Sequence, residues 1–217
     1  MSAAPAWLRY IDLAKSALIV VDMQNDFCHP DGAVGTGGMD LTRHAEIVPN
    51  IQRVIDAMHA AGRPVVFIKT THDDTTNSPA WLTRLRGGQS PICVTGTWGT
   101  EYFGVAPAEG DVEVIKHRYS AFIGTDLELR LRAMGIGTIV LTGVGTNVCV
   151  ESTMRDGFML DFYTLLVTDG TAAGSQADYA GTLAGARGML TDSADISAML
   201  DALPRTSAEP VGTEVAV

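Results

Sequence analysis

The stretch TIVLTGVGTNVCVEST, residues 138–153, decides the fold. Its first half is a β-branched and apolar run that predicts a strand over residues 138–142. A turn bracketed by Gly143 and Gly145 follows, and Cys149 then opens a predicted helix over residues 149–160. A cysteine at a helix start meets the positive end of the macrodipole and backbone N–H groups without an intrahelical partner. We expect this setting to lower the pKa of the thiol, and the same N–H groups to hold an oxyanion.

Strands and helices alternate on both sides of this stretch. The apolar runs predict strands at residues 17–21, 64–68, 112–115, 138–142 and 163–168, and a short sixth strand that begins at 189–190. The helical patterns cover residues 47–61, 126–134, 149–160 and 177–186. Residues 72–110 contain many turn residues and are predicted to be irregular, with short helical pieces around 81–86. This alternation predicts right-handed βαβ units, and therefore an α/β fold with a parallel sheet covered on both faces.

Composition limits the partners of the chain. A formal net charge of -10 argues against nucleic acid, which requires a basic face. No run approaches the roughly 20 apolar residues of a membrane span. Three scattered cysteines are too few for a disulfide framework and are typical of a reducing cytoplasm. We expect one domain over residues 1–217, with an N-terminal arm at 1–15 and a flexible tail at 204–217.

Three chemically complementary residues follow predicted strands. Asp22, Lys116 and Cys149 each stand at or just after the carboxyl end of a strand, the edge where open α/β sheets bind ligands. Each alone has an ordinary explanation: the aspartate as a turn or cap residue, the lysine as a solvated charge and the cysteine as a buried, inert side chain. Their joint placement favours a functional site.

The sequence resembles the isochorismatase-like cysteine hydrolases from about residue 17 to residue 203. The segments that carry the resemblance are IVVDMQNDF at 19–27, Lys116 with YSAF at 119–122, and TGVGTNVCV at 142–150. It implies a three-layer sandwich with a six-stranded parallel sheet and a catalytic triad of Asp22, Lys116 and Cys149. It also implies an oxyanion hole formed by the backbone N–H groups of Gly145 and Cys149, and a cis peptide bond between Val144 and Gly145.

The resemblance also indicates the reaction. Residues 22–28 and 124–129 resemble biuret hydrolase, residues 118–122 and 149–158 resemble ureidoacrylate amidohydrolase, and N-carbamoylsarcosine amidohydrolase is another relative by type. We therefore expect a cofactor-free amidohydrolase that cleaves a C–N bond of an amide, ureido or carbamoyl compound through a thioester-like intermediate. One alternative is an isochorismatase-type vinyl-ether hydrolase, although those members lack the nucleophilic cysteine. The other is a non-catalytic binding member of the fold.

Three aromatic residues are candidates for substrate binding. Phe27 and Tyr119 each either face the pocket or pack in the ordinary way, and Trp98 either belongs to the pocket or makes a subunit contact. The resemblance implies a homo-oligomer, a dimer or tetramer, with Trp7 and Leu8 as further candidate contacts.

Metal binding is not expected. Nicotinamidases of this family hold a metal through an Asp-x-His pattern after the second strand and a later histidine. Here Thr70 takes the place of that aspartate, and the following loop offers His72 no second histidine. We expect a structural or substrate-facing role for His72. The remaining histidines are predicted to be surface or loop residues: His29, His44, His59 and His117.

Overall fold

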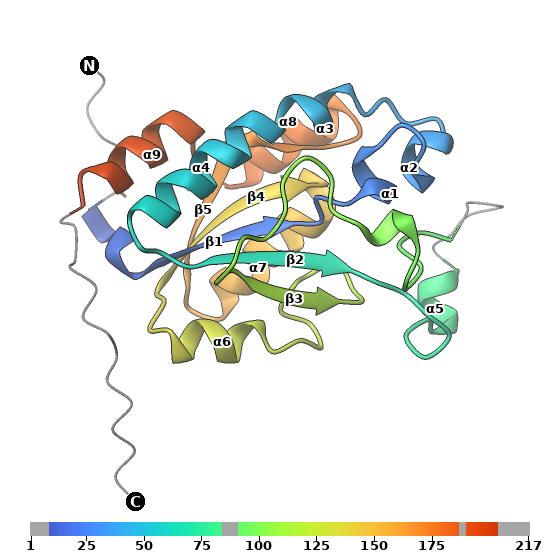
Figure 1. Cartoon of the computed structure of the whole chain (residues 1–217), viewed down its shortest axis with the longest axis horizontal. Coiled ribbons are helices and arrows are strands. Elements are labelled where there is room, and N and C mark those ends of the chain that lie inside the picture. The colour runs from blue at the N-terminus through green and yellow to red at the C-terminus, as the bar shows by residue number, and fades with distance from the viewer. Residues whose placement is uncertain (1–8, 84–90, 187–189, 204–217) are drawn as a thin grey trace, which may run out of the picture.

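A single parallel sheet forms the centre of the computed structural model, which describes residues 9–83, 91–186 and 190–203 (Figure 1). Within these ranges the sheet has six strands in the order β3-β2-β1-β4-β5-β6. Every neighbouring pair is parallel. The strands are β1 (Ser16–Val21), β2 (Val65–Thr70), β3 (Val112–Lys116), β4 (Thr138–Val144), β5 (Tyr163–Ala172) and β6 (Leu190–Thr191). The predicted parallel α/β sheet is confirmed.

Helices connect the strands and cover both faces of the sheet. The longer ones are α4 (Val48–Ala60), α6 (Leu127–Ala133), α7 (Glu151–Met159), α8 (Gln176–Ala186) and α9 (Ser193–Asp201). The short ones are η2 (Leu13–Lys15), α1 (Asn25–Cys28), α2 (Ala33–Thr36), α3 (Thr42–Glu46), α5 (Pro79–Leu82), η3 (Trp98–Thr100) and the π-helical turn η4 (Thr146–Val150).

Strand β1 shows why the sheet has two apolar faces. All six of its residues are buried. Successive side chains of a strand point to opposite faces. Leu18 and Val20 therefore join the core under α4 and α9, whereas Ile19 and Val21 join the core under α6 and α7. This explains the unbroken apolar run, which is typical of a strand covered on both sides.

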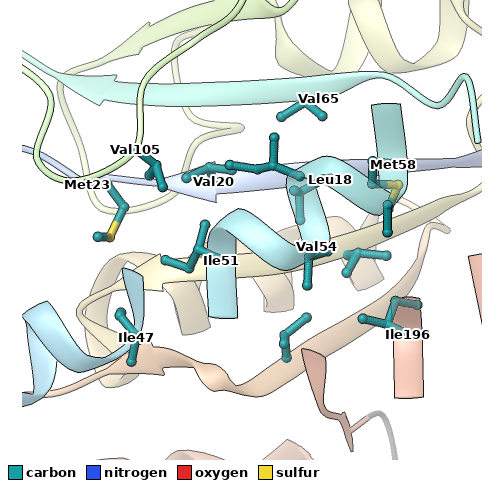
Figure 2. Packing of buried hydrophobic residues seen from close by; sticks show 14 of the residues in the cluster. Leu18, Val20, Met23, Ile47, Ile51, Val54, Met58, Val65, Val105 and Ile196 are labelled. Atoms are coloured by element: carbon teal, nitrogen blue, oxygen red, sulfur yellow. The ribbon is translucent and has the colours of Figure 1, made fainter. Parts of the chain in front are cut away.

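Helix α4 packs its apolar side directly on β1 (Figure 2). Ile51, Val54 and Met58 are completely buried and recur at helical spacing over Leu18 and Val20. Full burial of an aliphatic side chain contributes about 2 kcal/mol each. Helix α9 completes this layer, with Ile196 against the same cluster.

The structure differs from the prediction at several element boundaries. Strand β5 continues to Ala172 because, beyond a register shift near Leu141, it pairs again with the end of β4. Helix α9 was not predicted, although Asp192 caps its first turn and Ile196 and Leu200 share its buried face. The predicted helix after β4 begins earlier, as the turn η4, and the short helix predicted around 81–86 is α5 at Pro79–Leu82.

The order of the strands determines where on the sheet the site lies. From β1 the chain adds β2 and β3 on one side, then crosses over to add β4, β5 and β6 on the other. The carboxyl ends of β1 and β4 therefore border the crevice of a topological switch point, where open α/β sheets bind ligands. Figure 1 shows this edge facing the short helices α1 and α2.

Candidate active site

Asp22 follows β1 directly and is buried, with 1% of its side chain exposed. Its φ is 55°, in the left-handed region that non-glycine residues adopt rarely but aspartate tolerates better than most. Its backbone N–H donates to the carbonyl of Ile68 in β2 at 3.0 Å. The turn is thus fixed against the neighbouring strand, and the carboxylate is held at the carboxyl edge of the sheet.

Lys116 is the last residue of β3 and is also 1% exposed. Its Nζ lies 2.8 Å from Oδ2 of Asp22. The same ammonium donates to the hydroxyl of Thr70 at 2.7 Å and to the carbonyl of Arg118 at 3.0 Å. A buried charge is tolerated only when it is paired and hydrogen-bonded, and Lys116 meets both conditions.

Cys149 lies in the turn η4, where its sulfur is 3.4 Å from Nζ of Lys116. The carbonyl of Gly145 accepts hydrogen bonds from the N–H groups of Val148 at 3.0 Å and Val150 at 3.3 Å, on either side of Cys149 in the sequence. The peptide bond between Val144 and Gly145 is cis, as the resemblance implied. The structure therefore brings Asp22, Lys116 and Cys149 together.

The predicted lowering of the Cys149 pKa is wrong for the free protein. Burial raises the pKa of the thiol to about 12; the charge of Lys116 lowers it and the charge of Asp22 raises it again. A helix terminus supplies only about 0.3–1 kcal/mol, which is less than the cost of desolvating a thiolate. Cys149 therefore rests as a thiol and needs a base to become a nucleophile.

Lys116 keeps its charge in this buried setting. Burial acts to lower its pKa, but the negative charge of Asp22 outweighs burial, so the pKa of Lys116 is raised. The lysine is thus a fixed cation beside both the carboxylate and the sulfur.

A cavity of about 230 Å³ opens onto Lys116 and Cys149, and Asp22 is not among the residues of its wall. Its wall includes Lys116, Gly145 and Cys149, so both residues predicted to form the oxyanion hole border the cavity. The rest of the wall is mainly apolar and aromatic. It includes Phe27, Val34, Met39, Trp81, Ile92, Tyr119 and Val148.

The three aromatic residues predicted to bind substrate differ in position. Phe27 and Tyr119 line the cavity. The Tyr119 ring lies 5.2 Å from that of Trp81, which also borders the cavity. Trp98 is half exposed on η3, packs edge-on against His29 at 5.0 Å and is not part of the cavity wall. The subunit contact considered for Trp98 stays a prediction.

The residues around the cavity do not fit a metal site. Among the described residues, no group of three or more histidine, cysteine, aspartate or glutamate side chains is arranged to hold a metal ion. His72 is 3% exposed, lines the cavity and packs its ring 4.9 Å from that of Trp81. The Thr70 hydroxyl accepts a hydrogen bond from Lys116 and donates one to Asp22.

Two buried polar residues of the site were missed. His44, predicted to be a surface or loop residue, is 4% exposed and lines the cavity. Its Nδ1 is buried and has no hydrogen-bond partner within residues 9–83, 91–186 and 190–203. Burial lowers the pKa of His44 to about 4, against a weaker opposing effect of Asp40. Thr70 was considered only as a replaced metal ligand, whereas it contacts two residues of the predicted triad. Neither residue belongs to a sequence motif that signals this position.

The other cysteines are buried and unpaired. Burial raises the pKa of Cys28 to about 12, and burial also raises the pKa of Cys93. Trp7, Leu8 and the predicted tail at 204–217 lie outside the described residues. Within the described part of the chain, no helix has the length and apolar character needed to cross a membrane.

Comparisons with known proteins identify a family and similar chains. The family model described as the isochorismatase domain matches residues 16–195. The chain is 32% identical over 222 residues to ureidoacrylate amidohydrolase RutB of Methylobacterium radiotolerans, covering 95% of this chain and 86% of that protein. A cysteine hydrolase from Pseudomonas syringae pv. phaseolicola has a TM-score of 0.79 and 30% identity, over 93% of this chain and 99% of that one. N-carbamoylsarcosine amidase from Thermoplasma acidophilum has a TM-score of 0.68 and 30% identity, over 82% and 96% of the two chains.

Proposed function

The chain belongs to the isochorismatase family of hydrolases, and we propose that it is a cysteine-dependent amidohydrolase acting on a small ureido or carbamoyl compound. Relatives named ureidoacrylate amidohydrolase and N-carbamoylsarcosine amidase support hydrolysis of carbon–nitrogen bonds other than peptide bonds. Both names denote compounds that carry a ureido or carbamoyl group, which supports that substrate class.

One observation carries the proposal. Nζ of Lys116 lies 2.8 Å from a carboxylate oxygen of Asp22 and 3.4 Å from the sulfur of Cys149, and the sulfur borders the cavity. A base, a cation and a nucleophile thus meet where a substrate carbonyl has room to bind.

In the first half of the reaction, Asp22 takes the thiol proton as the Cys149 sulfur attacks the carbonyl carbon. A C–S bond forms and the carbonyl oxygen becomes an oxyanion, which the N–H groups of Gly145 and Cys149 would stabilise. Collapse of this intermediate breaks the C–N bond, and Asp22 returns its proton to the departing ammonia or amine. Lys116 stays charged and favours the thiolate while it exists.

In the second half, water replaces the departed nitrogen compound. Asp22 takes one proton from this water, and the oxygen attacks the thioester-like carbon. The C–S bond then breaks, and the proton on Asp22 returns to the sulfur. The acid product leaves, and the free enzyme again holds Cys149 as a thiol.

Ammonia release from a substrate panel tests the proposal. The panel holds biuret, ureidoacrylate, N-carbamoylsarcosine, nicotinamide and maleamate, with pyruvate release from isochorismate as the vinyl-ether control. We expect ammonia from a ureido or carbamoyl member and its loss in Cys149→Ala. Hydrolysis by Cys149→Ala at the wild-type rate would reject the cysteine mechanism, and pyruvate without ammonia would reject the amidohydrolase.

We also propose that the chain acts as one domain, in the cytoplasm, as a homo-oligomer. The three unpaired cysteines support a reducing compartment. Size-exclusion chromatography with light scattering measures the assembly, and a monomer at micromolar concentration would contradict it.

A further inference from the structure

Thr70 occupies the space between two residues of the proposed triad. It is the last residue of β2, the strand between β1 and β3, and it pairs in register with Lys116. Its hydroxyl lies 2.8 Å from Oδ1 of Asp22 and 2.7 Å from Nζ of Lys116. The residue is buried, with 4% of its surface exposed, and it borders the cavity.

The chemistry of the partners fixes the direction of both hydrogen bonds. A lysine ammonium only donates, so the Thr70 oxygen accepts from Lys116. A hydroxyl carries a single hydrogen, and the remaining neighbour, Oδ1 of Asp22, is an acceptor when the carboxylate is ionised. Thr70 therefore donates to Asp22, and this bond is complete only while Oδ1 carries no proton.

Thr70 itself is held firmly in place. The side-chain amide of Gln24 accepts from the Thr70 N–H at 2.7 Å and donates to the Thr70 carbonyl at 2.9 Å. Gln24 is completely buried and also donates to the carbonyl of Thr100 at 3.0 Å. The backbone of Thr70 is thus anchored to the segment that carries Asp22, so the distance between the hydroxyl and the carboxylate does not depend on a flexible loop.

We propose that Thr70 is a positioning residue that holds Asp22 in its ionised, proton-accepting form and directs the transferred proton to Oδ2. The proposal rests on the role of Asp22 as the base in the proposed function. With Oδ1 occupied by the hydroxyl, Oδ2, which lies 2.8 Å from Nζ of Lys116, is the oxygen that exchanges a proton with Cys149. The ammonium group of Lys116 carries three protons. It has four close neighbours, which are Asp22, Thr70, the Arg118 carbonyl and the Cys149 sulfur.

Three further titratable groups that interact electrostatically with Asp22 are neutral. Within the described part of the chain they are Cys28 of α1, Cys93 before η3, and Tyr102 after η3. Burial is the main cause that raises the pKa of each, so none of them ionises near neutral pH. His72 lines the same cavity from the segment that follows β2. Arg118 and Asp178 also border this cavity.

Thr70→Val tests the proposal because it removes the hydroxyl and keeps the shape. Without the donor, the carboxylate loses a charge-assisted hydrogen bond, which is stronger than the bond that the neutral acid accepts at the same oxygen. When the rate of Cys149 alkylation is plotted against pH, the acidic limb of the curve should therefore move to higher pH by about one unit. The probe is alkylation of Cys149 by iodoacetamide between pH 4 and pH 9, measured on the Cys149 peptide by mass spectrometry.

Two variants serve as controls. Thr70→Ser keeps the hydroxyl and should restore the wild-type limb. Thr142→Val removes a buried hydroxyl of β4 whose one hydrogen bond to the described residues goes to the Ile19 carbonyl at 3.4 Å, and it should leave the limb unchanged. If Thr70→Val does not fold, Thr70→Ala supplies a second hydroxyl-free side chain for the same comparison.

Alkylation separates this proposal from the proposed function, because it requires no substrate. A limb shifted in Thr70→Val and restored in Thr70→Ser supports the positioning role even if no panel compound is hydrolysed. Equal limbs in wild type and Thr70→Val would overturn it, as would a Thr70→Ser profile like that of Thr70→Val. Where a substrate is found, kcat/KM at pH 7 should fall at least about tenfold in Thr70→Val, mainly through kcat.

Discussion

Gly143 in β4 approaches the backbone of Val21 in β1 so closely that a side chain has no room between them. A Cβ atom on Gly143 would lie 2.0 Å from the Val21 carbonyl oxygen, and the φ of Gly143 is 107°. The two strands touch in this way immediately before Asp22 and the turn that leads to Cys149. The distance between base and nucleophile therefore depends on a position where only glycine fits.

We predict that Gly143→Ala lowers the free energy of unfolding by at least about 2 kcal/mol, because the added methyl collides with backbone that cannot rotate away. Urea denaturation followed by circular dichroism measures the loss. Gly181→Ala is the matched control, since Gly181 lies within α8 with open space around its Cβ position and gains helix propensity. A Gly143→Ala protein as stable as wild type would contradict the close contact.

The buried ion pair predicts an asymmetric response to substitution. Lys116→Met leaves the Asp22 carboxylate buried without its cation, and should lower the free energy of unfolding by about 3 kcal/mol at pH 7. Adding Asp22→Asn to that variant removes the unpaired charge and should recover part of the loss. Chemical denaturation of the two single variants and the double variant provides the comparison. A double variant less stable than both single variants would show that the pair is not coupled as the 2.8 Å distance indicates.

The resting state of Cys149 is open to direct observation. Because burial raises its pKa to about 12, wild type and Cys149→Ala should show the same absorbance at 240 nm, where thiolates absorb, up to about pH 9. A raised pKa favours the protonated form of an acid, so the thiol keeps its proton over the whole neutral range. A difference between the two proteins at pH 7 would indicate a stable thiolate and contradict this assignment.

His44 predicts a loss of stability in acid. Its folded-state pKa of about 4 lies below the ordinary histidine value of 6.5, so the unfolded chain binds a proton between these values while the folded chain does not. The contribution of His44 to the free energy of unfolding is fully present above about pH 6.5. It decreases as the pH falls from 6.5 towards 4, and about 2 kcal/mol is lost at pH 5. His44→Phe should show a correspondingly smaller difference in unfolding free energy between pH 7 and pH 5. Equal pH dependence in the two proteins would refute the prediction.

Much of the fold was predictable because the signals are local. The apolar runs that end at Val21 and Ile115 mark strands, and they placed Asp22 and Lys116 at strand ends. Helix α9 has an equally local signal in Asp192, Ile196 and Leu200, but that signal was not used. The extension of β5 to Ala172 has no such signal, because it depends on pairing with the end of β4.

The site was predictable in its members and less so in its chemistry. Cys149 was expected to ionise because the sequence shows a helix start, whereas the packing around η4 removes water from the sulfur and outweighs that effect. His44 carries no motif, and its position on the cavity wall follows from where α3 docks.

By itself the sequence determined which residues lie at the ends of which strands, because strand periodicity and turn residues act over a few neighbours along the chain. The tertiary structure alone decided how those ends interact. It placed the Thr70 hydroxyl between Asp22 and Lys116, and it kept Cys149 protonated. Desolvation and hydrogen-bond direction depend on atoms brought together from strands far apart in sequence, and no local pattern records them.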